Sequence, residues 1–179
     1  MVEVVLRAVR VDVGSSTPLL LLEEVTGTRV LPIFIGAPEA TAIAYALQGV
    51  KAPRPMSHDL LGNVIVALGA QLFAAEITEL RDNTFYANLR LLRDHDEINV
   101  SARPSDAVAL ALRVGAPILV NDELMAAEGR VMELDLDDDE DDDDVDVETD
   151  GDTDAPNEAD LVAELREFLD TIRPEDFGQ

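Results

Sequence analysis

The first third of the chain alternates apolar and polar side chains before it changes to a helical pattern. The alternation predicts strands over residues 2–11, 19–25 and 30–35. The segment 26–28, Thr-Gly-Thr, predicts a tight hairpin between the last two of these strands. An Ala-rich stretch then runs from Pro38 to Gly49, and a proline near the start with a glycine at the end is typical of a helix.

The second part of the chain repeats this order, after a Pro-rich connector at 51–55 and a helix from Ser57 to about residue 68, with Ser57 as its expected N-cap. The pattern predicts strands over 71–80, 84–92 and 98–101, a second Ala-rich helix over 104–114, a strand over 117–120 and a short helix ending near 129. Three strands and a helix, twice over, indicate a pseudo-duplicated β-β-β-α unit. Because the connections are short, we expect layered, mostly antiparallel sheets with packed helices, which is the α+β class.

Charge divides the chain into a body and a tail. Residues 1–134 hold 17 acidic and 11 basic residues, whereas residues 135–179 hold 21 and 2, so most of the net charge of −25 lies in the tail. Residues 135–156 hold 14 acids in 22 positions, which predicts a disordered linker. Apolar residues on one helical face predict an amphipathic helix over 157–173. The predicted folded domain is 1–134.

Composition excludes several classes of function. The chain has no Cys, which rules out disulfides, thiolate metal sites and Cys nucleophiles and fits a reducing compartment. The longest apolar run, 64–75, is far shorter than the roughly 20 residues of a membrane span, and Glu3 and Arg7 do not suit a signal peptide. We therefore expect a cytoplasmic protein with no membrane partner. The body lacks a basic stripe, so any binding to nucleic acid is expected to be weak.

Two polar clusters interrupt the apolar body, at 54–60 (RPMSHDL) and 101–107 (SARPSDA). Each places an Arg, a Pro, a Ser and an Asp directly before or inside the first turn of a predicted helix. Helix starts carry unpaired backbone N–H groups and favour anions. With a guanidinium and a carboxylate beside it, such a pair of starts suits a phosphodiester or a metal-bound phosphate.

These clusters, with segments around them, resemble the bifunctional nuclease (DNase-RNase) domain family. The matching segments are 31–36 (LPIFIG), 39–40 (EA), 42–43 (AI), 53–61 (PRPMSHDLL), 84–87 (TFYA), 102–111 (ARPSDAVALA) and 116–118 (API), which together cover roughly residues 2–129. The resemblance implies an α+β domain and cleavage of both DNA and RNA. The sequence departs from the family at Ser101, where many members carry an acid, and at Ser57, where Thr is more common. The acidic tail lies outside the resemblance.

Each candidate residue has a chemical and a structural interpretation. His58 is a candidate general acid or base, or a residue hydrogen-bonded to the backbone in a first helical turn. Asp59, Asp106 and Glu39 are candidate metal ligands, with Asp59 and Asp106 also assigned to catalysis, or acids that complement the helix dipole. Arg54 and Arg103 are candidate phosphate ligands, or structural ion-pair partners of Asp59 and Asp106. Ser57 and Ser105 are candidate substrate contacts, or helix caps.

Two functions of different classes follow. The first is a nuclease of low sequence specificity that uses Mg²⁺ or Mn²⁺, held by carboxylates that converge from the helix starts, and no organic cofactor. The second is a non-catalytic, oligomeric binding or regulatory module in which both clusters are structural. In either case, two similar halves with sheet edges and apolar helix faces predict a homo-oligomer.

Overall fold

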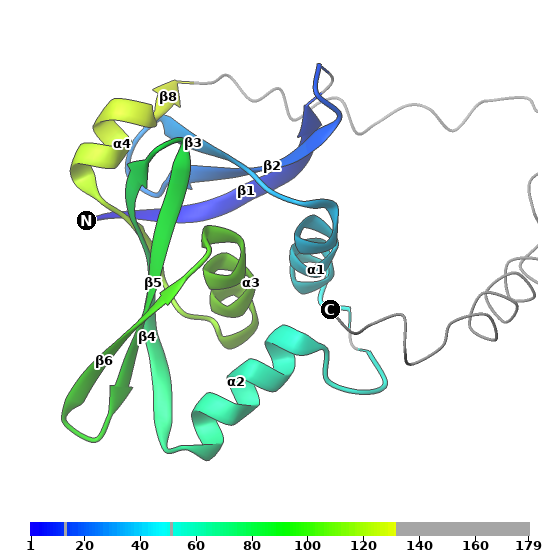
Figure 1. Cartoon of the computed structure of the whole chain (residues 1–179), viewed down its shortest axis with the longest axis vertical. Helices are drawn as coiled ribbons and strands as arrows, with labels where there is room; N and C mark the ends of the chain where they lie inside the picture. The colour runs from blue at the N-terminus through cyan, green and yellow to red at the C-terminus, as the bar shows by residue number, and fades with distance from the viewer. Residues whose placement is uncertain (13, 51, 132–179) are drawn as a thin grey trace, which may run out of the picture. The chain divides into compact units, whose positions relative to one another are not determined.

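One curved sheet of eight strands runs through the part of the chain that the computed structural model describes, which is residues 1–12, 14–50 and 52–131 (Figure 1). The strands are β1 (Val2–Asp12), β2 (Thr17–Glu24), β3 (Arg29–Phe34), β4 (Ala70–Arg81), β5 (Thr84–Arg93), β6 (Asp96–Ala102), β7 (Ile118–Val120) and β8 (Arg130–Val131). Their order is β6-β5-β4-β7-β1-β2-β3-β8, and every neighbouring pair is antiparallel except β4 and β7. The α+β class is confirmed, with one mixed sheet in place of several layered sheets.

The four helices of the described residues are α1 (Ala37–Leu47), α2 (Ser57–Ala67), α3 (Pro104–Val114) and α4 (Asp122–Glu128). The chain order is β1-β2-β3-α1, then α2, then β4-β5-β6-α3, so the predicted repeat of three strands and a helix is present. In the sheet the two sets of three strands lie on either side of the short β7, which joins β4 to β1. The linker at 135–156 and the helix at 157–173 lie outside the described residues.

Helix α3 forms the centre of the core, and the sheet curves around it (Figure 1). Its five residues from Ala107 to Ala111 are each no more than 1% exposed. Small alanines let the backbones of α1 and α2 approach α3, and Val108 and Leu110 belong to the core around it. Because the sequence of α3 is apolar on nearly every side, we expect the helix to be buried on nearly every side, and it is.

The start of α2 differs from the prediction. Ser57 is the first helical residue and is exposed, and Met56 occupies the N-cap position, so the predicted Ser57 cap is wrong. Asp59 supplies the capping interaction instead, because its Oδ2 accepts the Met56 backbone N–H over 2.9 Å. This is the carboxylate half of a capping box. Because Oδ2 of Asp59 makes this hydrogen bond, it is not free to bind a ligand.

None of the helices in residues 1–12, 14–50 and 52–131 is both long and apolar enough to cross a membrane.

Candidate active site at the helix starts

Helices α1, α2 and α3 begin close together, and each carries an ionisable side chain in its first turn. These are Glu39 in α1, His58 in α2 and Asp106 in α3, with Arg103 directly before α3. Arg103 Nη1 donates to Glu39 Oε1 over 2.8 Å, and its Nε and Nη2 donate to the two oxygens of Asp106 over 2.8 and 3.2 Å. The hydrogen bonds that Arg103 donates to Asp106 and Glu39 raise the pKa of its guanidinium. We call these four residues the Arg103 cluster.

His58 joins α2 to this cluster. Its Nε2 lies 3.1 Å from Asp106 Oδ1, and its side chain is 16% exposed. Burial raises the pKa of Asp106, but hydrogen bonds from Arg103 and His58 outweigh burial and hold the pKa below its ordinary value. The carboxylate is therefore ionised at neutral pH and only accepts hydrogen bonds. Neutral His58 consequently carries its proton on Nε2, and its Nδ1 keeps a lone pair.

Asp59 lies in the same turn as His58 but belongs to a different set of contacts. Its Oδ1 accepts a hydrogen bond from Arg113 Nε over 2.7 Å. Arg113 is only 10% exposed and also donates to the carbonyls of Ala109 in α3 and Ala42 in α1, each over 2.9 Å. Because Arg113 holds three helices together, we assign the Asp59–Arg113 pair to the scaffold. The predicted structural pair of Asp106 with Arg103 is present, whereas that of Asp59 with Arg54 is not.

Arg54 and Ser57 are placed close to His58 by the chain. Both are exposed, and within the described residues neither makes a side-chain hydrogen bond or ion pair. They remain available to a ligand that approaches the start of α2. The structure does not bring them into contact with the Arg103 cluster.

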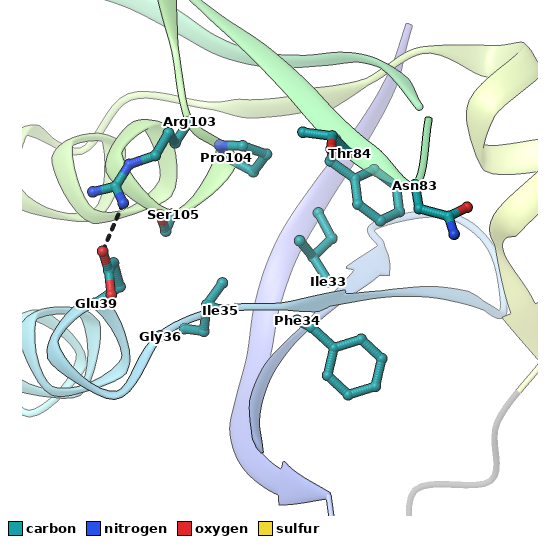
Figure 2. Close-up of a pocket in the computed structure, with 11 residues that line it drawn as sticks. Ile33, Phe34, Ile35, Gly36, Glu39, Asn83, Thr84, Arg103, Pro104 and Ser105 are labelled. Carbon is teal, nitrogen blue, oxygen red and sulfur yellow. Dashed lines mark hydrogen bonds and ion pairs between the residues drawn. The ribbon is translucent and has the colours of Figure 1, made fainter. Parts of the chain in front are cut away.

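A cleft of about 490 Å³ opens beside the Arg103 cluster (Figure 2). It lies between the end of β3, the β4–β5 turn and the starts of α1 and α3. Its lining residues are Ile33, Phe34, Ile35, Gly36, Glu39, Asn83, Thr84, Phe85, Arg103, Pro104 and Ser105. Segments 31–36, 84–87 and 102–111, which carry the family resemblance, therefore meet on one cleft.

Ser105 lies in the wall of this cleft in the first turn of α3. It is 6% exposed, and within the described residues its hydroxyl has no hydrogen-bond partner. The predicted role of Ser105 as a helix cap is wrong, because Arg103 is the N-cap residue and makes no side-chain cap hydrogen bond. A hydroxyl that faces a cleft without a protein partner can bind a ligand.

Four residues of this region escaped the sequence analysis: Phe34, Asn83, Phe85 and Arg113. Arg113 had a detectable signal, since it is the one basic residue in the last turn of an otherwise apolar helix. Phe34 had no such signal, because it shares a strand face with Val30, which is 1% exposed, and yet is itself 60% exposed. Asn83 and Phe85 come to the cleft through a hairpin turn far away in sequence, which periodicity does not reveal.

The carboxylates do not form the metal site that the sequence suggested. Glu39 and Asp106 both bind Arg103, and Asp59 binds Arg113. In the described part of the chain no three His, Asp or Glu side chains are grouped so that they could hold a metal ion. A guanidinium that sits between two carboxylates occupies the position that a cation would take, so this arrangement does not fit a divalent ion.

The chain belongs to the bifunctional nuclease domain family, whose model matches residues 20–133. An uncharacterized protein of Mycobacterium tuberculosis is 45% identical over 175 residues, which cover 98% of this chain and 97% of that relative. The plant relatives are more distant. Bifunctional nuclease 2 of Arabidopsis thaliana is 26% identical over 64% of this chain and 35% of its own length, and bifunctional nuclease 1 of japonica rice is 26% identical over 55% and 31%. The chain spans about a third of these plant proteins.

Proposed function

We propose that this protein hydrolyses phosphodiester bonds of both DNA and RNA with low sequence specificity, and that the Arg103 cluster is its active site. The observation that carries the proposal is the contact of Arg103 and His58 with one ionised carboxylate, Asp106, at the meeting point of three helix starts. Family membership supports nuclease-type chemistry.

Arg103 is the proposed phosphate ligand. A guanidinium has five N–H groups, and three of them donate to Glu39 and Asp106. The other two face no acceptor among the described residues, and the side chain is 66% exposed. The backbone N–H groups of Ser105 and Asp106 also lack acceptors in the described part of the chain, as expected in a first helical turn. Together they offer several donors to a phosphate oxygen.

His58 is the proposed proton carrier. In the hydrolysis, a water oxygen forms a bond to phosphorus, the ester P–O bond breaks, the Nδ1 lone pair of His58 takes the water proton, and the departing oxygen takes a proton from solvent. Asp106 accepts the Nε2–H of His58 and stabilises the imidazolium that forms. This is the arrangement in which a carboxylate orients a general base.

Glu39 decides between two accounts of the cluster. If Glu39 is a metal ligand, Glu39→Gln should lower a Mg²⁺- or Mn²⁺-dependent rate. If Glu39 only holds Arg103 through its 2.8 Å contact, the same change removes a negative charge beside the guanidinium and should strengthen binding of single-stranded DNA. We expect the second result. Measuring both rate and affinity, with added Mn²⁺ and with a chelator, separates the two.

The proposal is tested on Arg103. Arg103→Ala should lower cleavage of DNA and RNA by about 10²-fold or more, because a phosphate ligand is lost. Arg93→Ala removes another exposed arginine, at the end of β5 and outside the cleft, and should leave the rate unchanged. Melting temperatures of both variants show whether they are folded. A folded Arg103→Ala protein that cleaves as fast as the wild type would overturn the proposal.

We further propose that the chain forms a homo-oligomer through α2. Four large apolar side chains of this helix and its C-cap are exposed on one side: Leu60 (56%), Leu61 (38%), Val64 (43%) and Leu68 (67%). An apolar helix face of this kind is typical of a symmetric interface. Light scattering of the full chain at micromolar concentration should give at least twice the mass of one chain, and Val64→Glu should reduce it. A mass of one chain for the wild type would remove this proposal.

A further inference from the structure

The cleft beside the Arg103 cluster has two chemically different ends. Figure 2 shows Arg103 and Glu39 at one end and Phe34 and Asn83 at the other. The surface between them is apolar, with Ile33 and Ile35 each no more than 9% exposed. A ligand that fills this cleft would therefore carry an anionic group and, beside it, a flat or apolar group with hydrogen-bonding edges.

Ser105 lines the cleft at the same end as Arg103 and offers a hydroxyl to a ligand. Ser105 as a residue is 6% exposed, and its hydroxyl has no protein partner in the described part of the chain. The hydroxyl oxygen is not one of the fully buried atoms without a partner, so it is accessible to solvent, and the residue lines the cleft. It can therefore donate to or accept from a ligand group that enters the cleft.

The other end presents an aromatic ring to solvent. Phe34 is 60% exposed at the last position of β3, although it follows a strand whose other apolar residues are largely buried. Asn83, in the β4–β5 turn, has a left-handed backbone (φ 57°) and is also exposed, so its amide is open to a ligand. An exposed ring next to an amide is suited to stacking and hydrogen-bonding a nucleobase.

We propose that the cleft binds one unpaired base of the nucleic acid, stacked on Phe34, while the adjoining phosphate lies on Arg103. This inference rests on the proposed nuclease function and adds the class of substrate. A base in a duplex is stacked on both faces and paired at its edge, so it must leave the helix to reach Phe34. The cleft therefore selects single strands and loops over duplexes. Since every base of DNA and of RNA has a flat π-face that can stack on a ring, it accepts both DNA and RNA.

The test compares binding of a short, fluorescent single strand, as DNA and as RNA, to full-length protein that carries His58→Ala to prevent cleavage. Adding Phe34→Ala should weaken binding by about 5- to 150-fold, the loss that corresponds to one base–aromatic stack. Phe73→Ala removes another exposed phenylalanine, on β4 and outside the cleft, and should leave affinity unchanged. Phe34→Tyr keeps a ring and should preserve binding, which guards against a general folding defect.

A second arm uses strands in which every base is removed and the sugar-phosphate backbone is kept. Affinity should fall for these strands, and Phe34→Ala should then have no further effect. If Phe34→Ala binds all strands as the wild type does, the base site is wrong even where cleavage is observed. If binding depends on Phe34 but the wild-type protein cleaves neither DNA nor RNA, the base site stands and the proposed nuclease function fails.

Discussion

Asp59 and Asp106 pair with different arginines, and this separates two acids that look equivalent in the sequence. Asp106 accepts from Arg103, which lines the cleft, and from His58, whereas Asp59 accepts from the nearly buried Arg113. The sequence predicted the pairing of Arg103 with Asp106 because the two lie three positions apart on one helix start. It did not predict the pairing of Arg113 with Asp59, because the two are 54 positions apart and meet only after α2 packs on α3.

Asp59 provides a prediction about acid stability. The Met56 backbone N–H is the largest cause of its lowered pKa, burial opposes it, and Arg113 adds to the lowering. A carboxyl whose folded pKa is depressed stabilises the fold above its ordinary pKa, and that stabilisation is lost as the pH falls through the folded value. Asp59→Asn should therefore melt at a lower temperature than the wild type at neutral pH, and the difference should shrink below about pH 4.

Thermal melts between neutral pH and about pH 3 measure this directly. Asp96→Asn is the control, since Asp96 is exposed and makes no side-chain contact within the described residues. It should show no comparable dependence. A difference for Asp59→Asn that stays constant across the range would mean that the ionised carboxylate does not act through Arg113 and Met56.

At the scale of elements, the position of α2 determines whether His58 reaches Asp106. Helix α2 approaches α3 closely at Gly62, where a Cβ atom would lie 3.3 Å from Val114 Cγ1 and 3.7 Å from Leu110 Cδ1. The sequence indicated that both helices exist and roughly where they begin. It did not show that a glycine inside α2 permits their contact, because that depends on which helix faces meet.

Gly62→Leu tests this contact. A leucine has no room there, so it should push α2 away from α3 and lower the free energy of unfolding by about 1–3 kcal/mol. Because His58 moves with α2, cleavage should fall by about 10²-fold, as small displacements of catalytic groups do. Val66→Leu, at a position of α2 that is 68% exposed, should change neither quantity. If the Gly62→Leu protein is destabilised but cleaves as fast as the wild type, the rate does not depend on the position of His58.

At the scale of the whole molecule, the fold was largely predictable and the site was not. The strands and helices follow from alternation and from Pro and Gly signals, and the order of three strands and a helix is repeated as expected. The joining of both halves into one sheet depends on β7, a strand of three residues. The sequence predicted that three acids near the helix starts hold a metal ion. In the structure Arg103 and Arg113 pair with these acids.

The acidic tail is also a property of the whole chain. Residues 135–179 carry 21 acids and two bases and should repel nucleic acid from the Arg103 cluster at low ionic strength. A chain ending at Leu134 should therefore bind single-stranded DNA more tightly than the full chain, and the gain should shrink as salt rises. Fluorescence anisotropy over a salt series measures it. Equal affinities at low salt would leave the tail without an electrostatic role.

The central claim is that His58, oriented by Asp106, moves the proton during phosphodiester hydrolysis. The most direct measurement compares His58→Ala with His95→Ala, which removes the chain's other histidine from an exposed turn. Both proteins are purified identically, checked for unchanged melting and assayed on single-stranded DNA and RNA. We predict that His58→Ala loses about 10²-fold or more of the rate and that His95→Ala keeps it. Equal rates for the two variants would contradict the account.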